Sequence, residues 1–188
     1  MGLFSRKKQI KFIPNFKKPD YDNWLDFIDC GGSSKEWERL KKENKWVFPE
    51  SEAEKFQRYL KEVDAVAGRY FDKMQEIEKD WSVMYNLKTY TGSIADKFEK
   101  KCLANIADYR EMRRIDSKYG EKTATNIPAF RRLAMLYEKQ GRFEDAVEVC
   151  KHAYSLGMDE RSRMARMIKK AGRKPTQAEE RIFSFEHN

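Results

Sequence analysis

Five basic side chains near the C-terminus have a spacing that could bind phosphate groups. Arg163, Arg166, Lys170 and Arg173 follow one another at steps of 3, 4 and 3, so a helix would place them on one face, with Lys169 beside them. A cationic face of this kind neutralises phosphates and releases counterions, which produces a salt-sensitive affinity that ignores sequence. The alternative is that these charges are solvated, or that they cover acidic residues elsewhere in the chain. The spacing leaves both interpretations open.

The basic charge of the chain is concentrated in two windows. The net charge is +8 over 188 residues. Residues 1–18 contain six basic side chains and no acidic one, and residues 158–174 contain seven basic and two acidic ones. These windows sum to +11, so the remaining residues sum to −3. A local basic patch attracts polyanions, so one candidate function is a nucleic-acid-associated protein that binds the phosphate backbone through basic patches at 1–18 and 161–174.

The sequence contains no pattern typical of a catalytic or metal-binding site. The only histidines, His152 and His187, are far apart, and neither has a cysteine or a second histidine at ligand spacing. The stretch CGGSSK at residues 30–35 contains fragments of a phosphate-binding loop but lacks the pattern G-x4-G-K-[ST]. We therefore expect a non-catalytic protein with no catalytic residue, no metal and no cofactor.

Cysteine usage and hydropathy indicate the compartment. Cys30, Cys102 and Cys150 are odd in number and widely spaced, unlike the cysteines of a disulfide framework. No run of about 18 apolar residues is present, so no membrane span is expected. Together these features favour a cytoplasmic location.

A heptad pattern predicts one long helix over 51–87. From Phe56 to Met84 the apolar residues recur at alternating steps of 4 and 3, which is a seam of four heptads. Gly68 lies inside this pattern and costs about 1 kcal/mol relative to alanine, so a kink or break is possible there. The seam at 51–84 could pair with the next helix or with a second copy of the chain, and a homodimer is therefore possible.

A second helix is expected over 93–119, antiparallel to the first because the connecting turn is short. Its apolar face would contain Ile94, Phe98, Cys102, Ile106, Tyr109 and Met112. Capping boxes are expected where Ser or Thr precedes Glu or Asp by three residues, at Ser51–Glu54, Ser93–Asp96 and Thr176–Glu179. Further N-caps are expected at Ser34, Asn126 and Asp159.

The stretch from 126 to 158 has two helix-length apolar patterns joined at Gly141. The first reads Phe130-x2-Leu133-Ala134-x2-Tyr137, and the second reads Ala146-x3-Cys150-x2-Ala153. This stretch resembles a tetratricopeptide repeat, a unit of about 34 residues that reads W-x2-L-G-x2-Y with a later A-x3-F. It departs from that pattern with Phe for Trp, Ala for Gly and Cys for the later aromatic residue. The small Ala134 and Ala146 would let two antiparallel backbones approach closely.

The resemblance implies a peptide-binding groove lined by the first helix of each pair. Carried over to this chain, the groove residues would be Arg131, Met135, Glu138 and Lys139. A single repeat cannot bury both of its faces, and a step of 34 residues back along the chain finds no second copy. The expected neighbours are therefore the helix over 93–119 and the basic helix over 159–171. The alternative is a solitary structural hairpin that binds nothing.

We therefore predict an all-α protein with an antiparallel helical hairpin and a C-terminal stack that resembles tetratricopeptide repeats. Its expected organisation is a basic, Trp-rich segment with short helices over 1–50, the long hairpin over 51–120, the repeat-like helices with a basic capping helix over 126–172, and a short helix or tail over 173–188. The leading expectation for function is a module that binds a protein or peptide, and nucleic-acid binding is the alternative.

Overall fold

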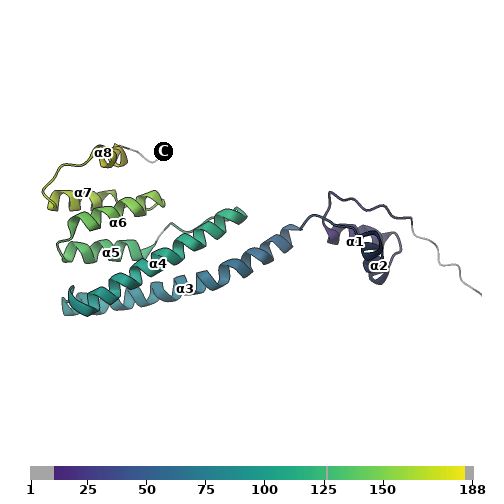
Figure 1. Cartoon of the computed structure of the whole chain (residues 1–188), viewed down its shortest axis with the longest axis horizontal. Helices are drawn as coiled ribbons and strands as arrows, with labels where there is room; N and C mark the ends of the chain where they lie inside the picture. The colour runs from purple at the N-terminus through teal and green to yellow at the C-terminus, as the bar shows by residue number, and fades with distance from the viewer. Residues whose placement is uncertain (1–10, 126, 185–188) are drawn as a thin grey trace, which may run out of the picture. The chain divides into compact units, whose positions relative to one another are not determined.

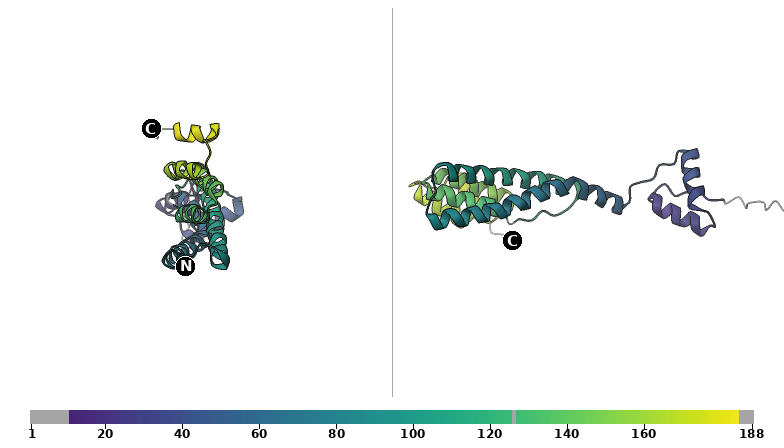
Figure 2. Two further views of the ribbon diagram at one scale, coloured as in Figure 1. Left: turned by 90° about the vertical axis from the view of Figure 1, so that its left-hand side faces the viewer. Right: turned by 90° about the horizontal axis from the view of Figure 1, so that it is seen from below.

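The computed structural model describes residues 11–125 and 127–184, and within these ranges the chain is all-α, as predicted. The described residues form eight helices and no strand (Figures 1 and 2). They divide into an N-terminal unit that ends at Arg58 and a second unit that begins at Tyr59. Each unit is described by itself.

The N-terminal unit is built around stacked aromatic rings. Helices α1 (Asp20–Asp29) and α2 (Ser34–Asn44) bring Phe27 and Trp37 together, with ring centroids 5.5 Å apart. Trp37 is only 1% exposed, and Trp46 and Phe48 from the segment after α2 pack against it at 5.5 and 5.6 Å. The N-cap of α2 is Ser33, which pairs with Glu36, and not Ser34 as predicted.

The predicted long helix is present as α3 (Glu52–Leu87), and it runs through Gly68 without a break. The expected capping box is confirmed, because the Glu54 side chain accepts a hydrogen bond from the Ser51 amide at 2.8 Å and the Ser51 hydroxyl accepts one from the Glu54 amide at 3.2 Å. This local contact fixes the first turn of α3 before any tertiary packing is needed.

Helix α4 (Gly92–Tyr119) lies antiparallel along α3, and the two form the predicted hairpin (Figures 1 and 2). Of the two arrangements that the heptad pattern allowed, the structure shows the seam packed within the chain, because its residues from Val63 to Met84 lie in one core with the apolar face of α4. The seam is less covered near its start, where Leu60 is 39% exposed.

Two expectations for α4 are wrong. The helix begins one residue before Ser93, after Thr91 in extended conformation with no side-chain cap, so the predicted Ser93–Asp96 capping box is not formed. Ile94 is 49% exposed, and Ala95 is buried in its place. The helix starts at Gly92, whose φ of +76° suits glycine.

Polar side chains inside the seam fix how α3 and α4 align. The Asn105 amide is fully buried and donates a hydrogen bond of 2.7 Å to the backbone carbonyl of Tyr70. Asp116 is 4% exposed and accepts hydrogen bonds from Tyr59 at 3.0 Å and Thr123 at 2.6 Å. A buried polar residue in a heptad seam restricts the register, because any other alignment leaves it without a partner.

The remaining helices form a stack on the α3–α4 hairpin. They are α5 (Pro128–Lys139), α6 (Phe143–Ser155), α7 (Arg161–Lys170) and α8 (Gln177–Ser184). Helix α5 contacts α4, and α6 contacts both α5 and α7, so these helices follow one another in space as they do in sequence (Figure 1). Pro128 occupies the first turn of α5 as expected, whereas the predicted cap at Asn126 lies outside the described residues.

Small residues lie where α5 and α6 approach each other. Ala134 is 1% exposed and Ala146 is fully buried, and Leu133 and Tyr137 fill the space beside them. The turn between the helices contains Gly141 with a φ of +75°, a conformation that glycine adopts without strain.

Enlarging one of these alanines is expected to destabilise the stack. Ala146→Leu should lower the free energy of unfolding by about 1–3 kcal/mol, because the extra atoms overpack a contact that has no free volume. Chemical denaturation followed by circular dichroism measures this change. The control is Ala165→Leu on the exposed face of α7, which should change stability by less than about 0.5 kcal/mol. Equal effects of the two substitutions would contradict a close α5–α6 contact.

Candidate functional site

The candidate polyanion-binding residues lie on and just after α7. The apolar face of this helix contains Met164, Met167 and Ile168, all 2% exposed or less. Arg163, Arg166, Lys169 and Lys170 occupy the remaining positions, whereas Arg173 lies beyond the end of the helix and does not share a helix face with them, contrary to the prediction. What lies against them decides whether they form a free cationic surface.

Glu138 of α5 lies among three of these cations. Its carboxylate accepts hydrogen bonds from Lys170 at 2.7 Å and Arg166 at 2.9 Å, and the Arg163 guanidinium is 3.9 Å away. The Glu138 side chain is only 16% exposed. Burial alone would raise the pKa of its carboxyl, but the hydrogen bonds from Lys170 and Arg166 outweigh burial, and the pKa lies below its usual value. Glu138 is therefore a charged link between α5 and α7.

Glu160, the residue before α7, forms a second link between the same helices. It is 7% exposed, and its carboxylate contacts Arg163 at 2.9 Å and Arg131 of α5 at 3.4 Å. Two acidic side chains, Glu138 in α5 and Glu160 just before α7, thus connect these helices along one surface.

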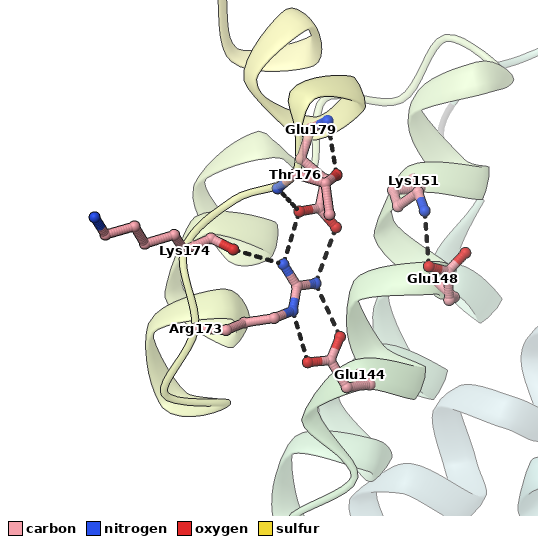
Figure 3. A network of polar contacts seen from close by, with 7 residues as sticks. All are labelled: Glu144, Glu148, Lys151, Arg173, Lys174, Thr176 and Glu179. Carbon is pink, nitrogen blue, oxygen red and sulfur yellow. Dashed lines mark hydrogen bonds and ion pairs between the residues drawn. The ribbon is translucent and has the colours of Figure 1, made fainter.

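Arg173 is the centre of a third network, which attaches α8 to α6 (Figure 3). Its guanidinium donates two hydrogen bonds to Glu144 of α6 at 2.7 and 2.8 Å and two to Glu179 of α8 at 2.8 and 2.9 Å. A fifth goes to the Lys174 carbonyl at 3.1 Å, so all five N–H donors are used. These hydrogen bonds, first to Glu179 and then to Glu144, raise the pKa of the guanidinium.

Glu179 is also held by the predicted capping box of α8, which is confirmed. Its carboxylate accepts a hydrogen bond of 2.7 Å from the Thr176 amide, and the Thr176 hydroxyl accepts one of 3.4 Å from the Glu179 amide. The side chain is 2% exposed. Hydrogen bonding by Arg173, with a smaller contribution from Thr176, lowers the pKa of the Glu179 carboxyl to about 2 despite its burial.

The structure thus places acidic partners against four of the five polyanion candidates, namely Arg163, Arg166, Lys170 and Arg173. This is the arrangement that the alternative interpretation of the basic helix described. Lys169 is exposed and makes no ion pair with the described part of the chain. The acidic partners were not identified from the sequence. Glu160 precedes Arg163 by three residues, a local pair that the spacing could have indicated, whereas Glu144 and Glu179 lie on other helices and the fold brings them to Arg173.

The four groove candidates on α5 do not share one environment. Glu138 is occupied by α7, and Met135 is half-buried against the core. The Arg131 side chain is 53% exposed, and Lys139 is exposed with its ammonium 5.5 Å from the Tyr90 ring. Arg131 and Lys139 are therefore the groove candidates that remain accessible to a partner.

The opposite side of α5 is fixed to the hairpin by charged contacts. The Tyr137 hydroxyl donates a hydrogen bond of 2.7 Å to Glu99 of α4, and Arg142 contacts the same carboxylate at 2.9 Å. Burial, followed by the hydrogen bond to Glu99, raises the pKa of Tyr137. Arg132 reaches Glu78 of α3 at 2.8 Å. This side of α5 is not available to a ligand.

The described residues contain no group of three or more His, Cys, Asp or Glu side chains placed to hold a metal ion. His152 lies beside Arg110 and packs edge-on against Phe130 at 5.2 Å, and burial together with Arg110 lowers its pKa. Cys150 is 1% exposed, and burial raises the pKa of its thiol to about 12, so the thiolate is scarce at neutral pH. None of the helices described is long and apolar enough to span a membrane.

Comparison of the chain with protein-family models, with curated proteins and with solved structures finds no match.

Removing the Arg173 guanidinium is expected to detach α8. In Arg173→Gln the buried Glu179 carboxylate loses its counter-ion, and breaking such a pair costs about 3–5 kcal/mol. Hydrogen exchange of the α8 amides should therefore accelerate more than about tenfold, while α5 and α6 keep their protection. Lys174→Gln is the matched control, because that residue contributes only its backbone carbonyl to the network. Equal exchange in the two variants would show that Arg173 does not hold α8.

The low pKa of Glu179 predicts how α8 responds to acid. Because the pKa in the folded state lies below the ordinary value of 4.5, this carboxylate stabilises the fold fully above about pH 4.5 and loses that effect as the pH falls through about 2. The amide resonance of Thr176, which donates to this carboxylate, should therefore shift with a midpoint near 2 in an NMR titration. A midpoint near 4.5 would contradict the network.

Proposed function

We propose that this chain is a non-catalytic interaction module that binds a protein or peptide through the surface shared by α5 and α7. The observation that supports this proposal is the pair of links through Glu138 and Glu160, which connect α5 to α7 along one surface, with α6 packed against both helices. A surface preorganised in this way loses little conformational entropy when a partner binds.

The accessible side chains of this surface suggest the chemistry of the partner. Arg131, Lys139 and Lys169 are exposed, and all three are cationic. The acidic residues of the same region form ion pairs within the chain. The net charge of the exposed side chains on this surface is therefore positive. An acidic peptide or an acidic segment of a protein is the partner that complements this surface.

The resemblance to tetratricopeptide repeats fits this proposal. In such proteins the first helices of successive pairs line the groove, and here α5 and α7 would take those positions with α6 between them in the chain. Helix α7 would then begin a second, incomplete pair. The unpaired state of Cys30, Cys102 and Cys150 supports the expected cytoplasmic compartment, which is part of the same proposal.

Nucleic-acid binding is the weaker proposal. It needs free cations, and within 161–174 most of the candidate cations contact carboxylates of α5, α6 or α8. Phosphates would have to displace these carboxylates, which would then be half-buried without partners. In the window 1–18 only residues 11–18 are described, and there Lys18 pairs with Asp26 at 2.8 Å.

A charge-changing variant separates the two proposals. In Lys139→Glu/Lys169→Glu the accessible charge of the surface is reversed, and Arg131 and Glu138 are left unchanged because both take part in the links between α5 and α7. The protein partner captured by the wild-type chain from its native host should be lost from this variant. Affinity capture with and without nuclease, read out by quantitative mass spectrometry, measures the loss.

The control is Lys61→Glu/Lys100→Glu, which changes two exposed lysines of the α3–α4 hairpin and should keep the partner. Equal capture by both variants would rule out the α5–α7 surface. Capture that disappears on nuclease treatment would favour the nucleic-acid proposal.

A further inference from the structure

The closed end of the α3–α4 hairpin has large apolar side chains that the fold leaves exposed. Val83 and Leu87 at the end of α3 are 49% and 63% exposed, and Ile94 at the start of α4 is 49% exposed. Single exposed apolar residues are common, but several at one end of a hairpin typically mark a binding site. Figure 1 shows this end, where the short turn joins α3 to α4.

Two of these residues border a cavity. Val83 and Ile94 line a hollow of about 450 Å³, together with Met84 and Phe98, which are 1% exposed and belong to the core. Pockets that bind ligands have volumes of roughly 300–1,000 Å³ and are mostly apolar. The cavity therefore has the size and the lining to accept apolar side chains from outside the chain.

The fold itself explains why this site is open. Because Ala95 and not Ile94 enters the core, the larger side chain remains outside and a small one occupies the buried position. Ile94, which the apolar periodicity of the sequence assigns to the core, is therefore exposed and available to a partner.

The two lysines at the border of the cavity differ in their pairing with carboxylates. Lys101 is neutralised by Asp80 at 2.6 Å and by Glu76 at 2.8 Å. Lys97 also lines the cavity, is exposed, and makes no ion pair within the described ranges. The apolar hollow therefore has an unpaired cation at its edge.

We propose that the closed end of the α3–α4 hairpin binds an amphipathic segment of another protein, whose apolar side chain enters the cavity and whose acidic residue pairs with Lys97. In a symmetric contact with a second copy, the carboxylates offered to Lys97 would be Asp80 and Glu76, which already pair with Lys101, so a different protein is the better partner for this surface. This surface shares no residue with the α5–α7 surface, so either proposal can fail without the other.

A designed peptide provides the probe. It is a helix-forming peptide of roughly 18 residues, with Leu and Phe along one face and Glu beside them; a second version has Lys in place of Glu. Fluorescence anisotropy should show that the acidic peptide binds the full chain and that Ile94→Ser weakens this binding at least about tenfold. The Lys version should bind more weakly, and Lys97→Glu should reduce the difference between the two peptides.

Leu103→Ser is the matched control, since Leu103 lies on the same helix with the same 49% exposure but does not line the cavity. It should leave binding unchanged, and circular dichroism should show equal helicity in all variants. The proposal is overturned if the acidic peptide does not bind, if Ile94→Ser and Leu103→Ser act alike, or if both peptides bind equally. A dimer in sedimentation that Ile94→Ser dissociates would instead assign the site to a second copy.

Discussion

The Glu138 carboxylate joins α5 to α7, and the proposed interaction surface depends on this link. A carboxylate that is only 16% exposed must be paired, because an unpaired buried charge costs several kcal/mol. Lys170 and Arg166 supply that pairing from a helix 28 to 32 residues further along the chain. The requirement acts in both directions: α7 supplies the cations that α5 needs, and α5 supplies the charge that allows a helix so rich in cations to pack against its neighbours.

This constraint changes the meaning of the most conspicuous sequence feature. The cations of α7 that suggested a surface for phosphate are largely internal counter-ions, and Arg173 uses four of its five donors to join α6 to α8. The accessible positive charge comes from Arg131, Lys139 and Lys169, which the internal pairs leave exposed. The proposed interaction surface is therefore what remains of a basic region after its own carboxylates have been satisfied.

Features that depend on local contacts could be predicted from the sequence, and those that depend on tertiary contacts could not. The capping boxes at Ser51 and Thr176 close within four residues, so their spacing could predict them, although the same spacing at Ser93–Asp96 forms no capping box. The heptad seam likewise identified the core face of α3. In α4 the same periodicity selected Ile94, although Ala95 also shares the face of Phe98 and is the residue that the structure buries. The periodicity also passed over Asn105, whose partner is a backbone carbonyl on another helix. Glu138 and Glu144 could not be identified as acidic partners of the basic residues for the same reason, because each contacts a cation that lies outside its own helix.

A double-mutant cycle between Glu138 and Lys170 tests the central claim most directly. The free energy of unfolding would be measured for the wild type, Glu138→Gln, Lys170→Gln and the double variant at low and high salt. The account predicts a favourable coupling energy of about 0.2–1 kcal/mol that falls as salt is added, since Lys170 is partly exposed. Strictly additive effects at both salt concentrations would contradict it, because the cations of α7 would then be free of α5 and the polyanion interpretation would regain its basis.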